Sequence, residues 1–397
     1  MQVAIWASHH AYSCLLRLAI INHQMIKKII LLILFLTLIS SSSFVLAYFY
    51  FQKDNSPLKS TISTKKVEQK ELPLLQYSIP ALSKREFVAE QAIEVEKIIS
   101  QNSADNSYVL LFTYLSQGKK ISGALNLKLD ENQSSKPVII MLRGWAPLEN
   151  YYSGMGTKNA AAIFAQNGYL TLAPDFLGYG ESDSEPSDTW EARFIKVANV
   201  IDLLRTIQKF PKLDLSQLED FPIENINIDQ EKIGLWGHSN GGQIAVSTLE
   251  VLGSNLPTTL WAPVLAPFPY SILYFTDENQ DEGKEARAYL SLFEKDYDVF
   301  DFSITQHLDR LQGPLQIQHG TSDDSALVTW SEEFLQKIDL ENDRRRAINA
   351  SQSATSSTQL REIKVDFYKY PGANHNLQPN WNQAVERDLS FFAKNLN

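Results

Sequence analysis

Residues 233–244, IGLWGHSNGGQI, place a serine among glycines at the boundary between two apolar runs. KIGLWG in front of Ser239 is typical of a short buried strand, and GGQIAVSTLEVLG behind it is typical of a helix. Because glycine has no Cβ, Gly237 and Gly241 leave room where a strand turns directly into a helix. The pattern G-x-S-x-G in this context predicts a sharp turn that exposes the Ser239 hydroxyl. The alternative is a glycine-rich turn whose serine has no chemical role.

The apolar runs around this turn predict an α/β fold. Short runs that are apolar on both faces alternate with segments of helical periodicity. We therefore expect a mostly parallel central sheet with helices on both faces, preceded by a strand pair joined at Gln117 and Gly118. The other expected strands are 136–144, 169–174, 232–237, 258–267, 314–320 and 363–372, and the expected helices include 159–168 and 190–210.

Three further segments carry their own patterns. Residues 82–101 have apolar side chains at helical spacing and are predicted to form one amphipathic helix. Residues 267–312 hold aromatic and acidic residues without a clear period, and we expect a small helical cap over the carboxyl edge of the sheet. The polar, serine-rich segment 339–360 is predicted to be a long surface loop. The cap is expected to roof the site with four aromatic residues, Phe268, Tyr270, Tyr274 and Phe275.

A serine hydroxyl becomes a useful nucleophile only beside a base that a third group orients. Downstream of Ser239 the candidate bases are His307, His319 and His375. His375 follows the last expected strand, in a glycine-containing loop that can reach back over the sheet edge, and is the predicted base. His319 leaves no later strand to carry the acid, and His307 lies in the expected cap.

The segments DQEKIGLWGHSNGG, HGTSDDSALVTW and YPGANHN together resemble the catalytic domain of the prolyl oligopeptidase (S9) family of serine peptidases. That family belongs to the α/β-hydrolase superfamily, and the likeness covers roughly residues 108–397. The acid is expected in HGTSDD, where Asp323 and Asp324 compete. The resemblance implies Asp323 as the acid and leaves Asp324 as a solvated loop carboxylate. It also implies an α/β-hydrolase fold that cleaves short peptides through an acyl-enzyme formed by Ser239, Asp323 and His375.

The resemblance also implies an oxyanion hole, a pair of backbone N–H groups that hold the developing negative charge. One donor is the N–H of Asn240, and the other is expected in the loop MLRGWAP, at Trp145. Relatives typically carry histidine and glycine before this donor, whereas this chain has Arg143 and Gly144. An alternative role for Arg143 is contact with an acidic group of the substrate.

S9 peptidases typically place a β-propeller before the hydrolase domain. Between the expected membrane segment and residue 108 only about 55 residues remain, too few for even four blades. Propeller-free relatives include esterases, so a carboxylesterase with the same three residues is the alternative to a peptidase. A protein that uses the fold only for binding is a third hypothesis, which the presence of all three residues disfavours.

The amino-terminal part has a different character. Residues 29–51 form an uncharged apolar stretch after Lys27 and Lys28, long enough to cross a membrane as a helix. We expect a single-pass anchor with residues 1–28 in the cytoplasm and the bulk of the chain outside it. The alternatives are a cleaved signal peptide with a secreted product, and a start of translation at Met25. Residues 52–107 are expected to be a tether followed by the amphipathic helix.

Charge and cysteine content exclude several partners. The formal net charge is -10 and the pI is about 5.3, which argues against nucleic acid because a basic surface is missing. Cys14 is the only cysteine, so neither an internal disulfide nor a thiolate metal cluster is possible. No metal-ligand motif occurs, and we expect neither a metal nor a cofactor.

Overall fold

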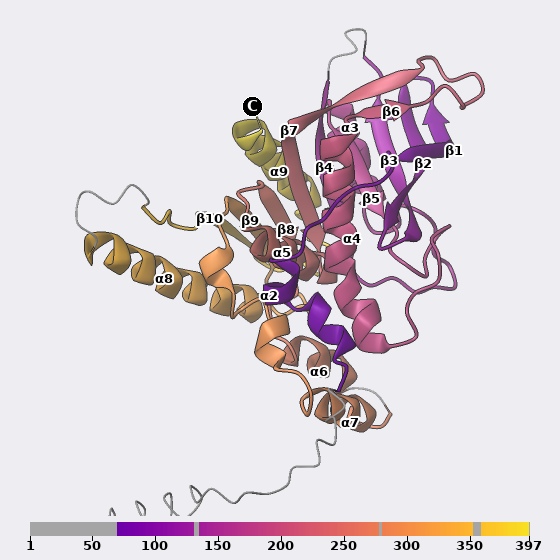
Figure 1. Cartoon of the computed structure of the whole chain (residues 1–397). Helices are drawn as coiled ribbons and strands as arrows, with labels where there is room; N and C mark the ends of the chain where they lie inside the picture. Colours follow the sequence, from indigo (N-terminus) through magenta and orange to yellow (C-terminus); the bar gives the residue numbers. More distant parts are fainter. Residues whose placement is uncertain (1–69, 131–134, 278–279, 352–358, 397) are drawn as a thin grey trace, which may run out of the picture. The chain divides into compact units, whose positions relative to one another are not determined.

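A ten-stranded mixed sheet is the centre of the fold, and its strands follow the order β10-β9-β8-β7-β4-β5-β3-β2-β1-β6 (Figure 1). The computed structural model describes residues 70–130, 135–277, 280–351 and 359–396. Its strands are β1 Glu94–Asn102, β2 Ser107–Ser116, β3 Lys119–Lys128, β4 Lys136–Leu142, β5 Leu170–Pro174, β6 Lys212–Asp214, β7 Asn225–His238, β8 Thr258–Trp261, β9 Leu315–Gly320 and β10 Val365–Tyr370.

The strands from β5 through β4, β7, β8 and β9 to β10 pair in parallel, as the α/β interpretation predicts. Strands β1 to β3 pair antiparallel and join the parallel part through β5. Strand β6 pairs in parallel with β1 and antiparallel with β7. Gln117 and Gly118 connect β2 to β3 with φ angles of 54° and 73°. Two positive φ values in a two-residue turn suit the twist of a hairpin, so the predicted strand pair is confirmed.

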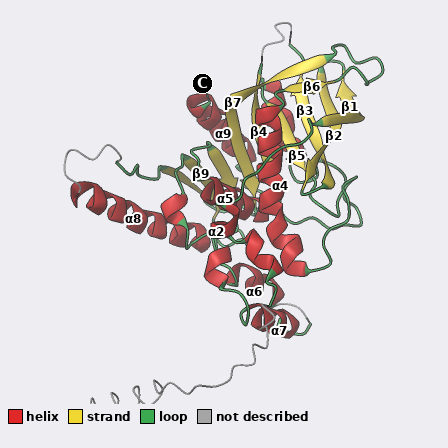
Figure 2. Cartoon of the chain, in the orientation of Figure 1, coloured by secondary structure: helices red, strands yellow, loops and turns green. Residues whose placement is uncertain are grey.

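Helices cover both faces of the sheet. On one face α3 and α9 bury side chains such as Phe164 and Phe392 in one apolar cluster with β4, β7 and β8. On the other face α4, α5 and α8 pack with the opposite sides of the same strands, through residues such as Ile201, Leu249 and Phe334. Figure 2 shows α4 and α5 in front of the strands. The helices are α2 Ile79–Leu82, α3 Lys158–Gln166, α4 Thr189–Lys209, α5 Asn240–Leu252, α6 Tyr270–Thr276, α7 Lys284–Phe293, α8 Val328–Ser351 and α9 Trp381–Asn395.

The amphipathic helix predicted over residues 82–101 is wrong. Helix α2 ends at Leu82, and β1 fills the second half of the segment as an antiparallel partner of β2. The register of β1 shifts between Val95 and Lys97 and again between Ile98 and Ser100. Such irregularities destroy the strict alternation that identifies a strand, and the spacing of apolar residues then imitates a helix.

The segment in front of β1 is part of the folded unit rather than a tether. A 3-10 helix, η1 (Pro73–Tyr77), and α2 bury Leu74, Tyr77 and Ile79 in the main apolar cluster. The Tyr77 hydroxyl donates a hydrogen bond of 2.9 Å to Oε1 of Glu191 on α4. Residues Glu71–Asn397 therefore form one compact unit.

The surface loop predicted over residues 339–360 is wrong in its first half, which belongs to α8. Polar side chains of this helix form hydrogen bonds with the backbone of neighbouring segments. Arg345 is 2 % exposed and its Nη2 donates to the carbonyl oxygens of Leu308 and Leu311, at 2.9 Å each. Asn342 exchanges two hydrogen bonds with the backbone of Ile363. A hydropathy pattern treats such residues as exposed, although their hydrogen bonds allow them to be buried.

Residues 267–312 form α6, α7 and two 3-10 helices, η2 (Val299–Phe302) and η3 (Leu308–Arg310). The aromatic roof expected from this segment is mostly wrong. Phe275 does line the cavity that contains Ser239. Phe268, however, is buried against Phe293, while Tyr270 is 66 % exposed and lies outside the cavity lining.

The predicted membrane segment, residues 29–51, lies outside the described residues. Within the described ranges, every helix is too short or too polar to cross a membrane.

Candidate active site

Ser239 lies between the end of β7 and the start of α5, with a backbone φ of 57°. Residues other than glycine rarely adopt this conformation, and surrounding contacts must hold it. A Cβ on Gly237 would come within 2.7 Å of the carbonyl oxygen of Gly241, and one on Gly241 would overlap the carbonyl oxygen of Leu142. The two glycines thus let the strand and helix meet closely enough to present the serine at a sharp turn.

His375 and Asp323 are brought together from the two loops that follow β10 and β9. Nδ1–H of His375 donates to Oδ2 of Asp323 at 2.9 Å, with Oδ1 at 3.1 Å. The His375 side chain is 20 % exposed, while the Asp323 side chain is fully buried. This bond fixes the tautomer of His375 and leaves its Nε2 as the proton acceptor. Asp324 is exposed, and its backbone carbonyl accepts a bond from the Tyr274 hydroxyl.

A second histidine supports the Asp323 carboxylate. His319 Nε2–H donates to the carbonyl of Ala326 at 2.8 Å and lies 3.2 Å from Oδ2 of Asp323. The N–H groups of Ser325 and Ala326 donate to Oδ1 of Asp323, each at 2.9 Å. Burial alone raises the pKa of Asp323, but the bonds from His319, His375 and Ala326 outweigh it and hold the pKa below the ordinary value. Asp323 is therefore a stable anion beside His375.

Ser239 and His375 line one cavity of about 760 Å³. The cavity is also lined by Asn240 and by Gly144 and Trp145 from the loop after β4. Within the described residues, the backbone N–H groups of Asn240 and Trp145 have no hydrogen-bond acceptor. Two free N–H groups beside a serine are the components that an oxyanion hole requires.

Arg143 is hydrogen-bonded within this loop and also lines the cavity that contains Ser239. It is 5 % exposed, and its Nη2 donates to the carbonyl of Asp175 at 2.7 Å. Its Nη1 donates to the carbonyl of Gly144 at 2.9 Å, and its Nε donates to the Tyr151 hydroxyl at 3.1 Å. The guanidinium also lies 4.1 Å from the ring centroid of Tyr179. With its nitrogens engaged in this way, Arg143 shapes the loop that carries Trp145.

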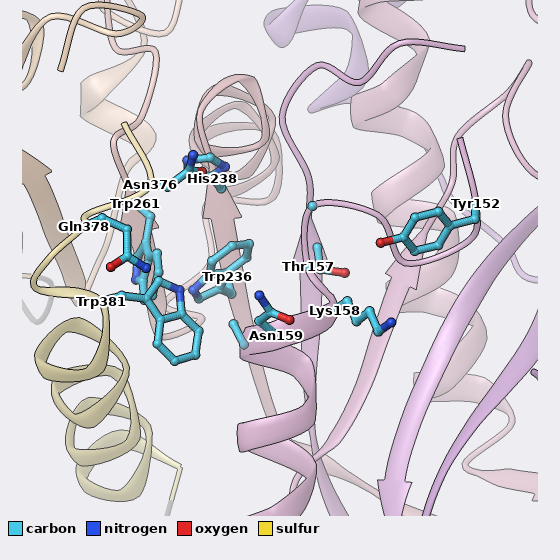
Figure 3. Close-up of a pocket in the computed structure, with 12 residues that line it drawn as sticks. Tyr152, Thr157, Lys158, Asn159, Trp236, His238, Trp261, Asn376, Gln378 and Trp381 are labelled. Atoms are coloured by element: carbon cyan, nitrogen blue, oxygen red, sulfur yellow. The ribbon is translucent and has the colours of Figure 1, made fainter. Parts of the chain in front are cut away.

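His238, the residue before the serine, holds the backbone of the predicted base. Its Nε2–H donates to the carbonyl oxygen of His375 at 3.0 Å, and the two ring centroids are 4.7 Å apart. Burial, followed by repulsion from His375, lowers the pKa of His238 to about 4, so the ring is neutral near pH 7. His238 also lines a second cavity of about 250 Å³, together with three tryptophans, Trp236, Trp261 and Trp381 (Figure 3).

No sequence motif indicates the roles of His319 and His238. His319 was considered only as a base, although its position four residues before Asp323 places it against the carboxylate. His238 fills the variable position of G-x-S-x-G, where the pattern carries no information. As to metals, no group of three or more His, Cys, Asp or Glu in the described ranges is arranged to hold one.

A serine at a strand-to-helix turn, with a histidine and an aspartate at the carboxyl ends of later parallel strands, defines the class of this protein. It has the fold of an α/β-hydrolase. The model of the prolyl oligopeptidase family matches residues 156–397, more than half of the sequence. The chain therefore belongs to the prolyl oligopeptidase family, which confirms the resemblance of the three motifs.

Individual relatives include peptidases and esterases. A protein of Paracoccidioides brasiliensis (strain Pb18) named "Probable dipeptidyl-aminopeptidase B" is 23% identical over 214 residues, which are 53% of this chain and 21% of that protein. A puromycin-hydrolyzing peptidase of Mycobacterium tuberculosis has a TM-score of 0.51 at 13% identity, over 75% of this chain and 40% of its own. Acetyl xylan esterase 1 of Thermoanaerobacterium sp. JW/SL YS485 also has a TM-score of 0.51, at 14% identity, over 81% of this chain and 99% of its own.

These similarities define the fold and the family, not the substrate. The structural neighbours share too little sequence to show more than the fold, and the matched regions make up 34% or less of the curated relatives.

Proposed function

We propose that this protein is a serine peptidase that cleaves short peptides through an acyl-enzyme on Ser239. The observation that carries the proposal is one arrangement. A strained serine lines the same cavity as His375, and His375 donates from Nδ1 to a buried, ionised Asp323. This combination makes a weak nucleophile reactive because the base is oriented and its charged form is stabilised.

We assign each group a step. Nε2 of His375 takes the hydroxyl proton as Oγ of Ser239 attacks the substrate carbonyl, and Asp323 stabilises the imidazolium that forms. The N–H groups of Asn240 and Trp145 hold the oxyanion of the tetrahedral intermediate. His375 then returns the proton to the leaving group, the C–N or C–O bond breaks, and an acyl-Ser239 ester remains. Water, deprotonated by His375, hydrolyses this ester and regenerates the serine.

The peptidase activity is favoured by the family and by the names of two of the relatives. The alternative is a carboxylesterase, and one observation favours it. Of the described residues that line the cavity, none is Asp or Glu. The free amino group of an aminopeptidase substrate therefore has no counter-ion in this lining.

Two measurements test the proposal. Fluorophosphonate should label Ser239, and Ser239→Ala should lose both labelling and turnover while keeping its unfolding midpoint. Labelling that persists in the variant places the nucleophile elsewhere. Matched p-nitroanilides and p-nitrophenyl esters of the same acyl groups then separate the activities, because an amine leaves only if His375 protonates it. Ready ester turnover with no anilide cleavage replaces the peptidase proposal by the carboxylesterase.

We also propose that residues 29–51 anchor the protein in a membrane with the hydrolase domain outside the cytoplasm. The support is the sequence alone: two lysines before an uncharged span and aromatic residues at its far end. A reporter at the carboxyl terminus tests orientation, and membrane fractionation tests retention. A soluble product trimmed at its amino terminus supports a cleaved signal peptide instead.

A further inference from the structure

Two cations on one face of α4 line the cavity that holds Ser239. Arg193 and Lys196 are three residues apart on the helix, so their side chains project from the same face. Both are half-buried, and both line the cavity together with Ser239 and His375. Neither residue lies in one of the sequence motifs.

Neither cation has a carboxylate partner within ion-pair distance in the part of the chain that the structure describes. Nη2 of Arg193 donates to Oε1 of Gln243 at 2.7 Å, a neutral acceptor on α5. The amine of Lys196 lies 5.9 Å from the ring centroid of Phe176. Glu185 attracts Lys196 electrostatically but does not form an ion pair with it.

Their surroundings disfavour the two charges. Burial lowers the pKa of Arg193 to about 10. Burial, with repulsion from Arg193 and Arg143, lowers the pKa of Lys196 to about 8. Burying a charge without a partner costs free energy. An anion bound in the cavity would offset this cost by pairing with the two cations.

The remainder of the lining selects what can carry that anion. No Asp or Glu is among the described lining residues, so nothing in the lining repels a negative group. Apolar side chains line the same cavity as the serine, including Ile244 from α5 and Ile272 and Phe275 from α6. The cavity thus combines two cations that lack a carboxylate partner in the described residues with an apolar surface.

We infer that Arg193 and Lys196 bind a carboxylate of the substrate, so that this hydrolase prefers substrates with a free carboxylate a few carbons from the scissile bond. The inference rests on the proposed function for the position of that bond. Arg193 is suited to the role because a guanidinium can donate two parallel hydrogen bonds to a carboxylate, and Gln243 already orients it. The carboxylate belongs either to the acyl group or to the leaving group.

A pair of esters that differ only in this charge tests the acyl side with the full chain. Monoethyl glutarate and ethyl valerate have acyl chains of similar length, and hydrolysis of both is followed by pH-stat. We expect kcat/KM for the charged ester to exceed that for the neutral one at least tenfold. Arg193→Gln and Lys196→Met should each lower this ratio by about 10- to 100-fold, mainly through KM. The control is Arg205→Gln on the same helix, whose partner is Gln208 and which should keep the ratio.

The leaving-group side is tested by acetylated dipeptides with a free or an amidated carboxyl terminus. A preference for the free acid that falls in both variants assigns the carboxylate to the leaving group. A wild-type enzyme without preference in either pair overturns the inference, and so does a ratio that both variants leave unchanged.

Binding separates this inference from the proposed function. Calorimetry with glutarate on Ser239→Ala should show binding that weakens at least tenfold when Arg193→Gln is added. If Ser239→Ala retains turnover while this binding behaves as expected, the proposed function fails and the anion site stands. If Ser239→Ala abolishes turnover and glutarate does not bind, only the anion site fails.

Discussion

Asp323 and Asp324 are adjacent in the sequence but differ in every property that matters for orienting a histidine. Asp323 is buried and accepts from His375, whereas Asp324 is exposed and bonds within its own loop. Asp323→Asn should therefore lower kcat by roughly 10³- to 10⁴-fold, because the amide no longer holds the productive tautomer. Asp324→Asn should change kcat by less than about threefold.

Steady-state kinetics of the two variants with one p-nitrophenyl ester measures this ranking. Circular dichroism controls for folding, since Asp323 also accepts bonds from Ser325 and Ala326. Equal losses in the two variants contradict the assignment of Asp323 as the acid.

At the residue scale the sequence was informative where a motif fixes a residue type. Ser239, Asp323 and His375 each lie in a short pattern whose chemistry needs that side chain. Arg193 and Lys196 belong to no such pattern. In a helix of mixed charge, the sequence does not distinguish cations that face water from cations that face a cavity. Only the packing of α4 beside α5 distinguishes the two.

At the scale of elements, one buried carboxylate fastens α9 to three strands. Oδ2 of Asp388 accepts from the indole N–H of Trp236 on β7 and of Trp261 on β8, at 3.1 and 2.7 Å. Oδ1 accepts from the amides of Gln316 and Gln318 on β9, at 2.8 and 2.6 Å. Asp388 is 0% exposed, so without its carboxylate the four N–H donors would lack an acceptor.

Asp388→Leu should lower the free energy of unfolding by roughly 3 kcal/mol or more, because several buried donors lose their acceptor together. Glu386→Leu makes the same chemical change at an exposed position of α9 and should alter it by less than about 0.5 kcal/mol. Urea unfolding followed by tryptophan fluorescence measures both. Similar midpoints for the two variants mean that Asp388 does not fasten the helix.

The elements that sequence reasoning misjudged share one cause. Segments β1 and α8 are held by backbone pairing and by buried polar bonds, so their apolar residues do not follow a regular period. The parallel strands and the helices α3, α4 and α5 were predicted well because most of their buried residues are apolar. Hydrophobic periodicity thus predicts elements whose buried residues are mostly apolar better than elements with many buried polar residues.

At the scale of the molecule, the order of the apolar runs predicted the fold class. It did not predict that the residues just before β1 belong to the folded unit. Helix η1 lies where a tether was expected and β1 lies where an amphipathic helix was expected, yet both contribute to the main apolar cluster. The cap segment, residues 267–312, was expected to be helical and to lie over the site, but the sequence did not show which side chains face inward. That depends on how α6 and α7 pack against α4.

The stability of the whole molecule in acid should depend on His238. Its pKa is about 4 in the folded chain, against an ordinary value of 6.5, because the ring is buried and faces His375. Asp323 and His319 are the other charged or titratable groups that act on it. Between these two values the unfolded chain binds a proton that the folded chain does not. Stability is therefore present above pH 6.5 and is lost as the pH falls towards 4.

His238→Gln removes this titration while keeping a side-chain N–H to donate to the carbonyl of His375. Urea unfolding of both proteins from pH 8 to pH 4.5 should show the variant gaining on the wild type as the pH falls, by up to roughly 3 kcal/mol. Taking the difference between the two proteins removes the contributions of other buried groups, such as Asp388 and Glu250, whose pKa values burial raises. Parallel stability curves would mean that His238 binds its proton as readily in the folded chain as in the unfolded one. The bond to His375 would then have to be made by a ring that is charged near pH 6.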